Sequence, residues 1–366
     1  MMPSTIAFIG LGLIGGSIAR GIKRNHPEVT IMAYMRTRAK LEAAHADGVI
    51  DLILDGIGEE LRTCDLIFLC TPVEYNARYL AELRPYLKPG ALITDVGSTK
   101  TKIHEAVIEL DMESCFIGGH PMAGSEKTGY DNSTDHLLEN AYYIITPTAA
   151  STEAEIGCLM SVAKTIGSIP IRLDYREHDF VTAAISHLPH VIASSLVNLV
   201  KDSDHSEGLM KQLAAGGFKD ITRIASSSPE MWEQICMSNR ENLAVILERY
   251  IASLSQVLSQ IKNNDEKALF ALFDTSKNYR NSISEREKGS LVPEYFFTVD
   301  VVDEPGSIST LSVILAAKGI SIKNIGINHN REHGEGVLGI MFYDEASMNA
   351  AWNQLSKYHY DLIKSR

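Results

Sequence analysis

Short apolar runs alternate with helical patterns along the first half of the chain. The runs at residues 5–10 (TIAFIG), 29–35 (VTIMAYM), 65–72 (DLIFLCTP) and 91–98 (ALITDVGS) each precede a segment with helical spacing. Such alternation predicts a parallel sheet with helices on both faces. We therefore expect an α/β domain over residues 1–172, in which Phe116-Ile117 begin a further strand.

Beyond residue 172 the pattern turns helical. Residues 179–200 (DFVTAAISHLPHVIASSLVNLV) have the pattern of a buried helix that Pro189 should kink, because proline lacks the N–H of the helical hydrogen-bond ladder. Residues 239–265 and 266–283 form amphipathic helices with wide apolar stripes. Surplus apolar surface is suited to pairing with a second subunit. We expect an all-helical domain over residues 173–288 that forms a homodimer.

The C-terminal part shows a third pattern. Residues 284–293 (SEREKGSLVP) are polar and charged and end in proline, which is typical of a linker. A strand, a turn at Pro305-Gly306, an amphipathic helix, two strands and a second helix follow in order. This order predicts a small βαββα domain over residues 289–366.

Composition narrows the functional classes. Of the 366 residues, 45% are hydrophobic and 22% are charged, as in ordinary globular proteins. The net charge of −12 and the absence of a dense Lys/Arg stripe argue against a nucleic-acid partner. An acidic protein repels anions at long range, so an anionic substrate requires local cations in its site.

Cysteine usage and hydropathy bear on the compartment. The five cysteines are scattered without a CxxC pair, which favours reduced thiols in the cytoplasm over disulfides or a bound metal. The apolar start lacks the basic segment of a signal peptide. We expect no membrane partner, on the ground that no uncharged stretch reaches the roughly 20 residues of a membrane span.

Gly10, Gly12 and Gly15 form a G-x-G-x-x-G motif between the first strand and the first helix. The first glycine permits a tight turn, the second lets the backbone approach a pyrophosphate, and the third allows close packing of helix on strand. With Leu13 and Ile14, the motif opens a helix whose free N–H groups face the phosphates. Its place between strand and helix predicts a dinucleotide site rather than a glycine-rich turn without a ligand.

Further cofactor-binding residues are expected at the carboxyl ends of the strands, where ligands of such sheets gather. Thr71-Pro72 and Gly97 lie at these ends. The second strand usually ends in an acidic residue that binds ribose hydroxyls, but Met35-Arg36 stand there in this chain. Arg36 can pair with a 2′-phosphate, which favours NADP, or it can lie over the adenine or face solvent.

Residues 118–129 (GGHPMAGSEKTG) place His120 among glycines and before Pro121. Pro121 biases His120 toward extended geometry, and we expect the glycines to leave space for a planar ligand beside the imidazole. A histidine there can take a hydroxyl proton while a hydride leaves the same carbon. Ser98, at a neighbouring strand end, is a candidate hydrogen-bond partner that orients the ring. The alternative is a structural histidine near a turn.

A second set of basic residues follows in the helical region. His187 and His190 are three apart and hence on one face of the expected helix, and Lys219 and Arg223 follow two glycines. Together these four residues are expected to form a cationic pocket in an otherwise acidic protein. Taken singly, each is better explained by a core or surface position.

Several of these motifs occur together in one enzyme family. The chain resembles the prephenate/arogenate dehydrogenase family over nearly its full length, in the stretches GLGLIGGSIA, DVGSTK, GGHPMAGSEKTG, SHLPH and GGFKDITRIASSSPEMW. The resemblance implies a Rossmann-type domain and oxidative decarboxylation of prephenate to 4-hydroxyphenylpyruvate, or of arogenate to tyrosine. Because the family mostly uses NAD, it implies NAD despite Arg36.

The resemblance also implies roles for individual residues. His120 matches the histidine that takes the proton of the ring 4-hydroxyl, and Ser98 matches a serine near that hydroxyl and the nicotinamide. Glu126 matches a gating acid at the mouth of the site. The positions that bind or line the substrate are His190, Arg223, Lys219 and Trp232, with Arg223 pairing with a carboxylate.

The C-terminal pattern resembles an ACT domain, a module that binds amino acids between paired copies. By this resemblance the turn at Glu304, Pro305 and Gly306, together with Asn324, would frame an effector site, and tyrosine is the expected end-product inhibitor. The alternative is a module that only associates subunits.

Two other classes fit parts of the pattern. Dehydrogenases of the 3-hydroxyacid and phosphogluconate type share the architecture but use a catalytic lysine on the long helix, where this chain has His187 and His190. A non-catalytic sensor of NAD(H) and amino acids is the second, and the set of Ser98, His120 and Arg223 argues against it.

Overall fold

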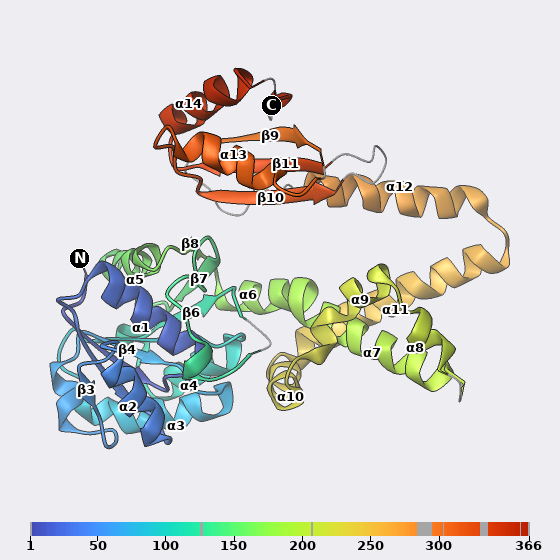
Figure 1. The fold of residues 1–366 in the computed structure, drawn as a ribbon. Helices are drawn as coiled ribbons and strands as arrows, with labels where there is room; N and C mark the ends of the chain where they lie inside the picture. Colours follow the sequence, from blue (N-terminus) through green and yellow to red (C-terminus); the bar gives the residue numbers. More distant parts are fainter. Residues whose placement is uncertain are drawn as a thin grey trace. The chain divides into compact units, whose positions relative to one another are not determined.

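The chain divides into two compact units, Met1–Ile283 and Ser284–Arg366. The computed structural model describes residues 2–124, 127–205, 208–283, 295–302, 304–329, 336–358 and 360–364 (Figure 1). The expected linker at 284–293 and the candidate Glu126 lie outside the described residues.

Five parallel strands form the sheet of the first unit, in the order β3-β2-β1-β4-β5. This is the strand order of a Rossmann-like sheet, so the expected parallel α/β fold is confirmed. The strands are β1 (Thr5–Ile9), β2 (Thr30–Tyr34), β3 (Leu52–Ile53), β4 (Leu66–Leu69) and β5 (Leu92–Asp95), and the helices between them are α1 (Leu13–Asn25), α2 (Arg38–Ala46), α3 (Val73–Leu83) and α4 (Thr101–Glu109).

Both faces of this sheet are buried, which explains why its strands are continuous apolar runs. Along β1 the side chains alternate between two separate cores. Ile6 and Phe8 pack into the core that includes α1 residues, while Ala7 and Ile9 pack into the core that includes α3 and α4 residues. The central strand therefore fixes the layer of helices on each side.

A second, three-stranded sheet continues from the first. A parallel bridge joins Ile93 to Phe116, and β6 then pairs antiparallel with β7, which pairs parallel with β8. The elements are β6 (Ile117–Pro121), β7 (Tyr142–Pro147), α5 (Glu153–Thr165) and β8 (Ile169–Arg172), with short 3₁₀ turns at η1 (Glu59–Thr63), η2 (Arg84–Tyr86), η3 (Glu113–Cys115) and η4 (Tyr130–Asn132).

The glycines before His120 serve close packing rather than an open space. A Cβ at Gly118 would lie 2.2 Å from Oγ1 of Thr146, and a Cβ at Gly119 would lie 2.6 Å from the carbonyl oxygen of Asp95. Neighbouring atoms already fill these two positions, so the expectation of open space was wrong for Gly118 and Gly119. A Cβ at Gly124 or Gly129 would meet no atom of the described residues within 4 Å. Gly118 and Gly119 let β6 approach β5 and β7.

The helix that follows β8 is continuous but changes its winding. It consists of α6 (Tyr175–Thr182), a π-helical turn η5 (Ala183–His187) and α7 (Leu188–Ser203). Pro189 follows this π-helical turn after Leu188, inside the continuous helix, and has no N–H to donate to the preceding turn. The feature that the structure shows beside Pro189 is this π-helical turn, and the expected kink stays a prediction.

This helix, Tyr175–Ser203, is long and apolar enough to cross a membrane by length and composition. Residues 180–200 contain no Asp, Glu, Lys or Arg, so our expectation about the length of uncharged stretches was wrong. The helix nevertheless carries the buried polar side chains of His178, Asp179 and His187, and it contacts α9 and α11. A core helix of a folded protein passes the same test of composition.

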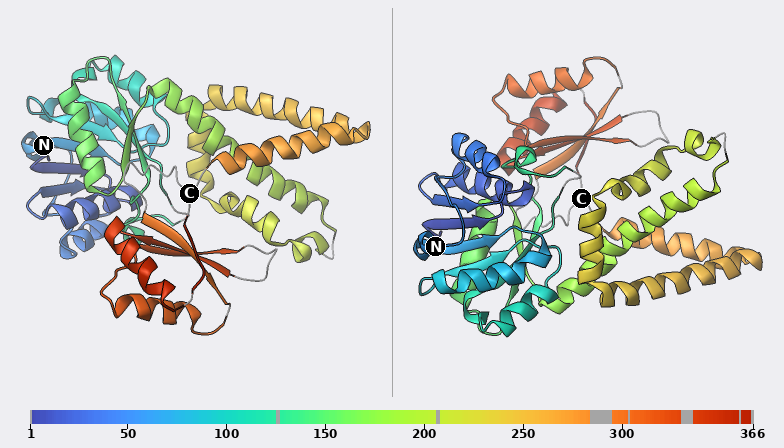
Figure 2. Two further views of the ribbon diagram at one scale, coloured as in Figure 1. Left: turned by 90° about the horizontal axis from the view of Figure 1, so that it is seen from above. Right: turned by 90° about the horizontal axis from the view of Figure 1, so that it is seen from below.

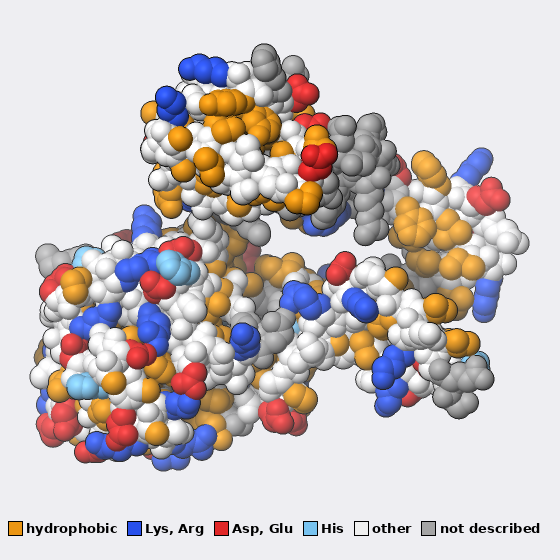
Figure 3. Space-filling model, in the orientation of Figure 1, with side chains coloured by type: hydrophobic (Ala, Val, Ile, Leu, Met, Phe, Trp, Pro, Cys, Tyr) orange, Lys and Arg blue, Asp and Glu red, His pale blue; other side chains and the backbone are white. Residues whose placement is uncertain are grey.

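Further helices complete the first unit, and α11 and α12 form an antiparallel hairpin (Figure 2). Only Leu243 of α11 is buried and no residue of α12 is, and Figure 3 shows hydrophobic side chains gathered over this hairpin. The elements are α8 (Leu209–Leu213), α9 (Gly216–Thr222), η6 (Arg223–Ser226), α10 (Pro229–Ser238), α11 (Arg240–Lys262) and α12 (Glu266–Ser282).

The second unit is an antiparallel sheet in the order β10-β11-β9-β12, with its own hydrophobic core that includes Phe297, Leu311 and Ile340. The expected βαββα order is present, and a short strand that the sequence pattern did not indicate follows it and pairs with β9. The elements are β9 (Tyr295–Val301), α13 (Ser307–Ala316), β10 (Asn324–His329), β11 (Gly336–Phe342), α14 (Glu345–Ser356) and β12 (Leu362–Lys364).

The crowding at Gly118 generates a stability prediction. Gly118→Ala should lower the free energy of unfolding of the first unit by about 1–3 kcal/mol, because the added methyl overlaps Thr146 and His104. Urea denaturation followed by circular dichroism measures the change. The matched control is Gly157→Ala, at an exposed position of α5 where a Cβ meets no atom of the described residues within 4 Å. It should be neutral or stabilising by up to about 1 kcal/mol. Equal stability of the two variants would contradict the packing account.

Candidate active site

The glycine-rich turn after β1 has the geometry of a phosphate cradle. Gly10 adopts φ +93°, and a Cβ there would lie 2.7 Å from the carbonyl oxygen of Cys70. A Cβ at Gly15 would lie 2.8 Å from the carbonyl oxygen of Gly10. At Gly12, by contrast, a Cβ would meet nothing within 4 Å. Two glycines are therefore required by packing, and Gly12 leaves space open beside the backbone.

The first helix offers unpaired donors at this cradle. Gly12 precedes α1, which starts at Leu13-Ile14, and no side chain in the described part of the chain caps its N-terminus. The first turn also has no acidic residue. Free N–H groups and the positive end of the helix dipole together favour a bound phosphate. These residues therefore fit a dinucleotide pyrophosphate.

The other expected cofactor residues lie at the carboxyl ends of the strands. The hydroxyl of Thr71 donates to Oδ1 of Asn76 over 2.9 Å, and Pro72 immediately precedes α3. The N–H of Gly97 donates to Oδ2 of Asp95 over 2.9 Å. Arg36, after β2, is exposed and forms no ion pair with any described residue.

A buried ion pair fixes the strand that carries His120. Asp95 and Lys100 are both fully buried and paired with each other. Lys100 Nζ also donates to the carbonyl oxygen of Gly119 over 2.7 Å, and the N–H of Gly119 donates to Oδ1 of Asp95 over 3.1 Å. Both backbone groups of the residue before His120 are thus bound to one ion pair, which holds His120 at the carboxyl end of β5.

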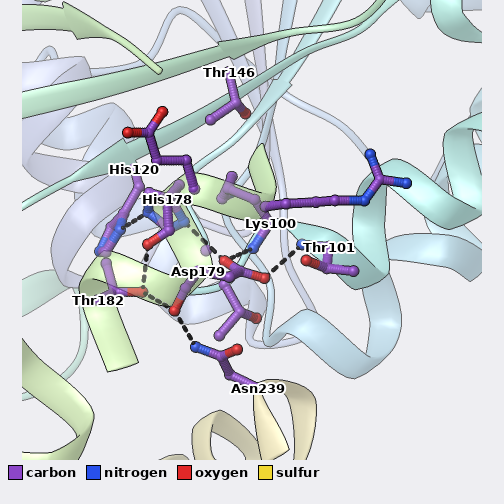
Figure 4. Close-up of polar contacts among 12 residues, drawn as sticks. Lys100, Thr101, His120, Thr146, His178, Asp179, Thr182 and Asn239 are labelled. Carbon is purple, nitrogen blue, oxygen red and sulfur yellow. Dashed lines mark hydrogen bonds and ion pairs between the residues drawn. The ribbon is translucent and has the colours of Figure 1, made fainter. Parts of the chain in front are cut away.

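A chain of polar side chains leads away from the imidazole of His120 (Figure 4). Its Nδ1 lies 2.8 Å from Nε2 of His178, and Nδ1 of His178 lies 2.8 Å from Oδ1 of Asp179. His178 is 1% exposed and Asp179 is fully buried. We had expected Ser98 to orient the imidazole of His120. The structure shows that the partner of Nδ1 is His178 instead. Ser98 lies between β5 and α4, and its role near the substrate stays a prediction.

The carboxylate of Asp179 joins the two parts of the first unit. It accepts from the N–H of Lys100 over 2.7 Å and from the N–H of Thr101 over 2.8 Å, and so caps α4 from the neighbouring helix α6. Burial alone would raise the pKa of Asp179, but the hydrogen bonds from His178, Thr101 and Lys100 outweigh burial and hold the pKa below its usual value. Asp179 is consequently a carboxylate acceptor for all three donors.

His120 is neutral under ordinary conditions. Burial lowers its pKa well below the usual value, and the positive charge of Lys100 lowers it further. A histidine with a depressed pKa keeps a lone pair available at neutral pH. The site therefore contains a neutral imidazole, held from one side, at the edge of the sheet where dinucleotides bind.

The second set of candidates lies on α7 and the segments packed against it. His190 stacks on Trp232 with ring centroids 3.5 Å apart. Burial lowers the pKa of His190, the charge of Arg223 lowers it further, and the backbone of Ile224 opposes both through a hydrogen bond. The structure thus brings His190, Trp232 and Arg223 together.

The remaining candidates are placed differently. His187 is 1% exposed, and its Nδ1 lies 3.2 Å from the side-chain nitrogen of Asn239. Burial lowers its pKa to about 4, so it is a neutral core histidine in this structure, and its assignment to the substrate stays a prediction. Lys219 is exposed on α9.

Sequence reasoning missed His178, Asp179 and Asn239, and it did not see that Lys100 holds the strand of His120. A signal for two of them was present, because His178 and Asp179 directly precede the long uncharged segment 180–200, which contains SHLPH. Asn239 has no such signal, since its two partners on the helix of Asp179 and His187 are 60 and 52 residues away.

A Rossmann-like sheet with an open phosphate cradle, and a neutral imidazole held at its carboxyl edge, define a dinucleotide-dependent dehydrogenase. Two family models match the chain, the nucleotide-binding domain of prephenate dehydrogenase over residues 18–171 and the dimerization domain of prephenate dehydrogenase over residues 174–275. The chain belongs to the prephenate dehydrogenase family.

Individual relatives agree with this placement. The prephenate dehydrogenase of Bacillus subtilis (strain 168) is 40% identical over 346 residues, which cover 94% of this chain and 93% of the relative. The crystal structure of prephenate dehydrogenase from A. aeolicus in complex with hydroxyphenyl propionate and NAD+ is 30% identical, with a TM-score of 0.72, covering 78% of this chain and 99% of that one. The crystal structure of Synechocystis arogenate dehydrogenase is 31% identical, with a TM-score of 0.69, and the match covers 76% of this chain and 100% of that one.

The open position at Gly12 generates a test of the cradle. Gly12→Ala should leave thermal stability unchanged, because the methyl meets no protein atom within 4 Å. It should weaken NAD binding about tenfold or more, equivalent to about 1.4 kcal/mol, because the methyl occupies the space that the pyrophosphate needs. Titration of NAD by fluorescence measures the effect, with Gly157→Ala as the control. Unchanged NAD affinity would place the dinucleotide elsewhere.

Proposed function

We propose that the chain oxidatively decarboxylates prephenate to 4-hydroxyphenylpyruvate with NAD as hydride acceptor. The observation that carries the proposal is the neutral imidazole of His120, bound through Nδ1 to His178 and therefore presenting its other nitrogen for proton transfer. The family relationship supports the substrate, since relatives named prephenate dehydrogenase match most of this chain.

The chemistry asks little of the protein beyond orientation and one base. The glycine cradle at Gly10, Gly12 and Gly15 would hold NAD, which would supply the hydride acceptor for carbon 4 of the ring. His120 takes the proton of the 4-hydroxyl as that hydride departs, which leaves a ketone at carbon 4. The ring carboxylate then leaves as carbon dioxide and its bonding electrons complete the aromatic ring. The oxygen at carbon 4 takes back the proton held by His120 and becomes a phenol. Aromatisation supplies the driving force, so a single imidazole suffices for catalysis.

The substrate carboxylates are assigned to cationic groups from the helical part. We place a carboxylate on Arg223, which lies close enough to His190 to lower its pKa. Trp232 stacks on His190, and its buried indole N–H has no hydrogen-bond partner among the described residues, so it is an available donor. The positive charge of Arg223 offsets the repulsion that the net charge of −12 exerts on an anionic substrate. Further contacts are assigned to Ser98, Lys219, Glu126 and His187.

NAD is the proposed cofactor, and Arg36 is the residue that decides between NAD and NADP. Its side chain is exposed and forms no ion pair with the described part of the chain, so a 2′-phosphate would find it accessible. Met35 packs against the core and offers no acceptor to the ribose hydroxyls. The NAD+ complex of the A. aeolicus relative supports NAD.

Arogenate is the second candidate substrate. The observation that favours it is the similarity to the Synechocystis arogenate dehydrogenase structure. Arogenate carries an amino group where prephenate carries a keto group, so the ring chemistry at His120 is the same for both.

The activity is tested with two substrates and two cofactors. We expect turnover of prephenate with NAD to exceed the other three combinations.

His120→Asn should lower kcat about 100- to 10,000-fold, the usual contribution of a general base, while NAD binding survives. Initial rates from NADH absorbance and NAD titration measure the two quantities. Near-normal turnover by the Asn variant would show that His120 is not the base. Faster turnover of arogenate than of prephenate would make arogenate the preferred substrate.

A homodimer through the α11–α12 hairpin is part of the proposal. The hairpin exposes a set of large apolar side chains to water. Contact with a second copy of the chain would bury them. The matching dimerization-domain model ends at residue 275, within α12. The exposed members are Val245, Ile251, Leu254, Leu258, Ile261, Phe270, Leu272, Phe273 and Tyr279.

The C-terminal unit is proposed to be an ACT-type regulatory domain that binds tyrosine. A cavity of about 550 Å³ lies beside Glu304, Pro305 and Gly306, where we expected an effector. Asp300 and Asp361 also line it, and Oδ1 of Asp300 is buried without a hydrogen-bond partner among the described residues. Acidic groups of this kind suit the ammonium group of an amino acid. Asn324 is not among the lining residues, and its role stays a prediction.

Tyrosine regulation has a specific test. Tyrosine should inhibit the initial rate, and Asp300→Asn should raise the inhibition constant about tenfold or more without changing the uninhibited kcat, because a charge-assisted hydrogen bond contributes about 1.5–3 kcal/mol. Tyrosine titration against prephenate turnover measures both variants, with phenylalanine as the ligand control. No inhibition at saturating tyrosine would leave subunit association as the function of this unit.

A further inference from the structure

A neutral imidazole has two tautomers, and only one of them makes His120 a base toward the substrate. Nδ1 of His120 faces His178 over 2.8 Å. If Nδ1 carries the proton, Nε2 has the lone pair and can accept a hydroxyl proton. If Nε2 carries the proton, that nitrogen can only donate. Whatever fixes the proton on Nδ1 therefore prepares the base.

The direction of the hydrogen bonds follows from the acceptor at the far end. The carboxylate of Asp179 can only accept, so Nδ1 of His178, 2.8 Å from Oδ1, must carry a proton. Nε2 of a neutral His178 then has a lone pair directed at His120. One proton is required between Nε2 of His178 and Nδ1 of His120, and the only remaining source is Nδ1–H of His120.

This assignment requires that His178 remain neutral, and its surroundings favour neutrality. The side chain is 1% exposed. Burial lowers its pKa, the positive charge of Lys100 lowers it further, and Asp179 and Asp95 oppose both. Lys100 in turn is paired with Asp95 and hydrogen-bonded to Gly119. A protonated His178 would reverse the last hydrogen bond and place the proton of His120 on the wrong nitrogen.

Asp179 is itself held in one position. Besides His178, its two oxygens accept from the backbone N–H groups of Lys100 and Thr101. Its backbone carbonyl accepts from Asn239 over 2.7 Å and from Thr182 over 3.2 Å (Figure 4). The carboxylate therefore cannot rotate without breaking the cap of α4.

We propose that Asp179 and His178 are positioning residues that keep the proton of His120 on Nδ1, which leaves Nε2 as the atom that takes the hydroxyl proton. This inference rests on the proposed role of His120 as the base. It assigns to these two residues a function that is exerted through the imidazole of His120.

A matched pair of variants separates this function from packing. The amide nitrogen of Asn in His178→Asn can still donate to Asp179, but the side chain is too short to accept from His120. The amide oxygen of Gln in His178→Gln reaches farther and can accept from Nδ1–H of His120. We expect His178→Asn to lower kcat about 10- to 100-fold, as is usual when the residue that orients a functional imidazole is lost, with little change in KM. His178→Gln should regain about tenfold.

The tautomer is measured directly on the full-length protein with NAD bound and no substrate. In protein labelled with ¹⁵N-histidine, solid-state NMR should show His120 protonated at Nδ1, with the signal assigned by its loss in His120→Asn. In His178→Asn the proton should move wholly or partly to Nε2, and in His178→Gln it should return to Nδ1.

The outcomes distinguish this inference from the proposed function. Protonation of His120 at Nε2 in the unmodified protein, or equal kcat for the Asn and Gln variants, would overturn the positioning role. A loss that appears only in KM would also overturn it. If the tautomers shift as expected and kcat follows them, the role is supported. Normal turnover by His120→Asn would instead reject His120 as the base, and with it the inference, while the tautomer result stands as a measurement.

Discussion

The buried carboxylate of Asp179 is the constraint on which the rest of the site depends. It lies on α6, in the helical part, and accepts from the N-terminus of α4, in the sheet part. A buried carboxylate without donors is strongly destabilised, so the two parts of this unit must meet where these N–H groups are directed. The same carboxylate binds His178, which holds His120. One interaction thereby sets both the junction of the two parts and the orientation of the proposed base.

A second buried charge supports the other side of His120. Asp95 and Lys100 form a fully buried ion pair, which by itself contributes little net stability because both groups lose hydration. The pair instead fixes the position of Gly119, because it binds both the N–H and the carbonyl of that residue. Removing either partner would leave the other charged and buried, at a cost of about 3–5 kcal/mol. The backbone of β6 is thereby prevented from shifting relative to β5.

The sequence was informative wherever a pattern is local. The strand–helix alternation predicted the parallel sheet, and the glycine spacing predicted the cradle, because both depend on residues close together in the chain. The wide apolar stripes of α11 and α12 likewise predicted helices with an unpartnered face. These features follow from periodicity and backbone geometry alone.

The features that the sequence did not reveal are contacts between distant segments. Gly118 and Gly119 suggested open space, yet the atoms that fill it come from Asp95 and Thr146, which no local pattern connects to them. Ser98 was the expected partner of His120 because it is near in the sheet order, whereas His178 comes from the next part of the chain. Two side chains 58 residues apart meet only through tertiary packing.

The low pKa of His120 keeps the imidazole neutral but also makes it a weaker base. Burial and the nearby charge of Lys100 keep the imidazole neutral, so the base is ready across the physiological pH range. A less basic imidazole removes a proton with less driving force. In the proposed reaction this smaller driving force is sufficient, because loss of carbon dioxide and aromatisation follow and make the overall reaction irreversible. A weak but always neutral base is therefore better suited to this site than a stronger one that is partly protonated.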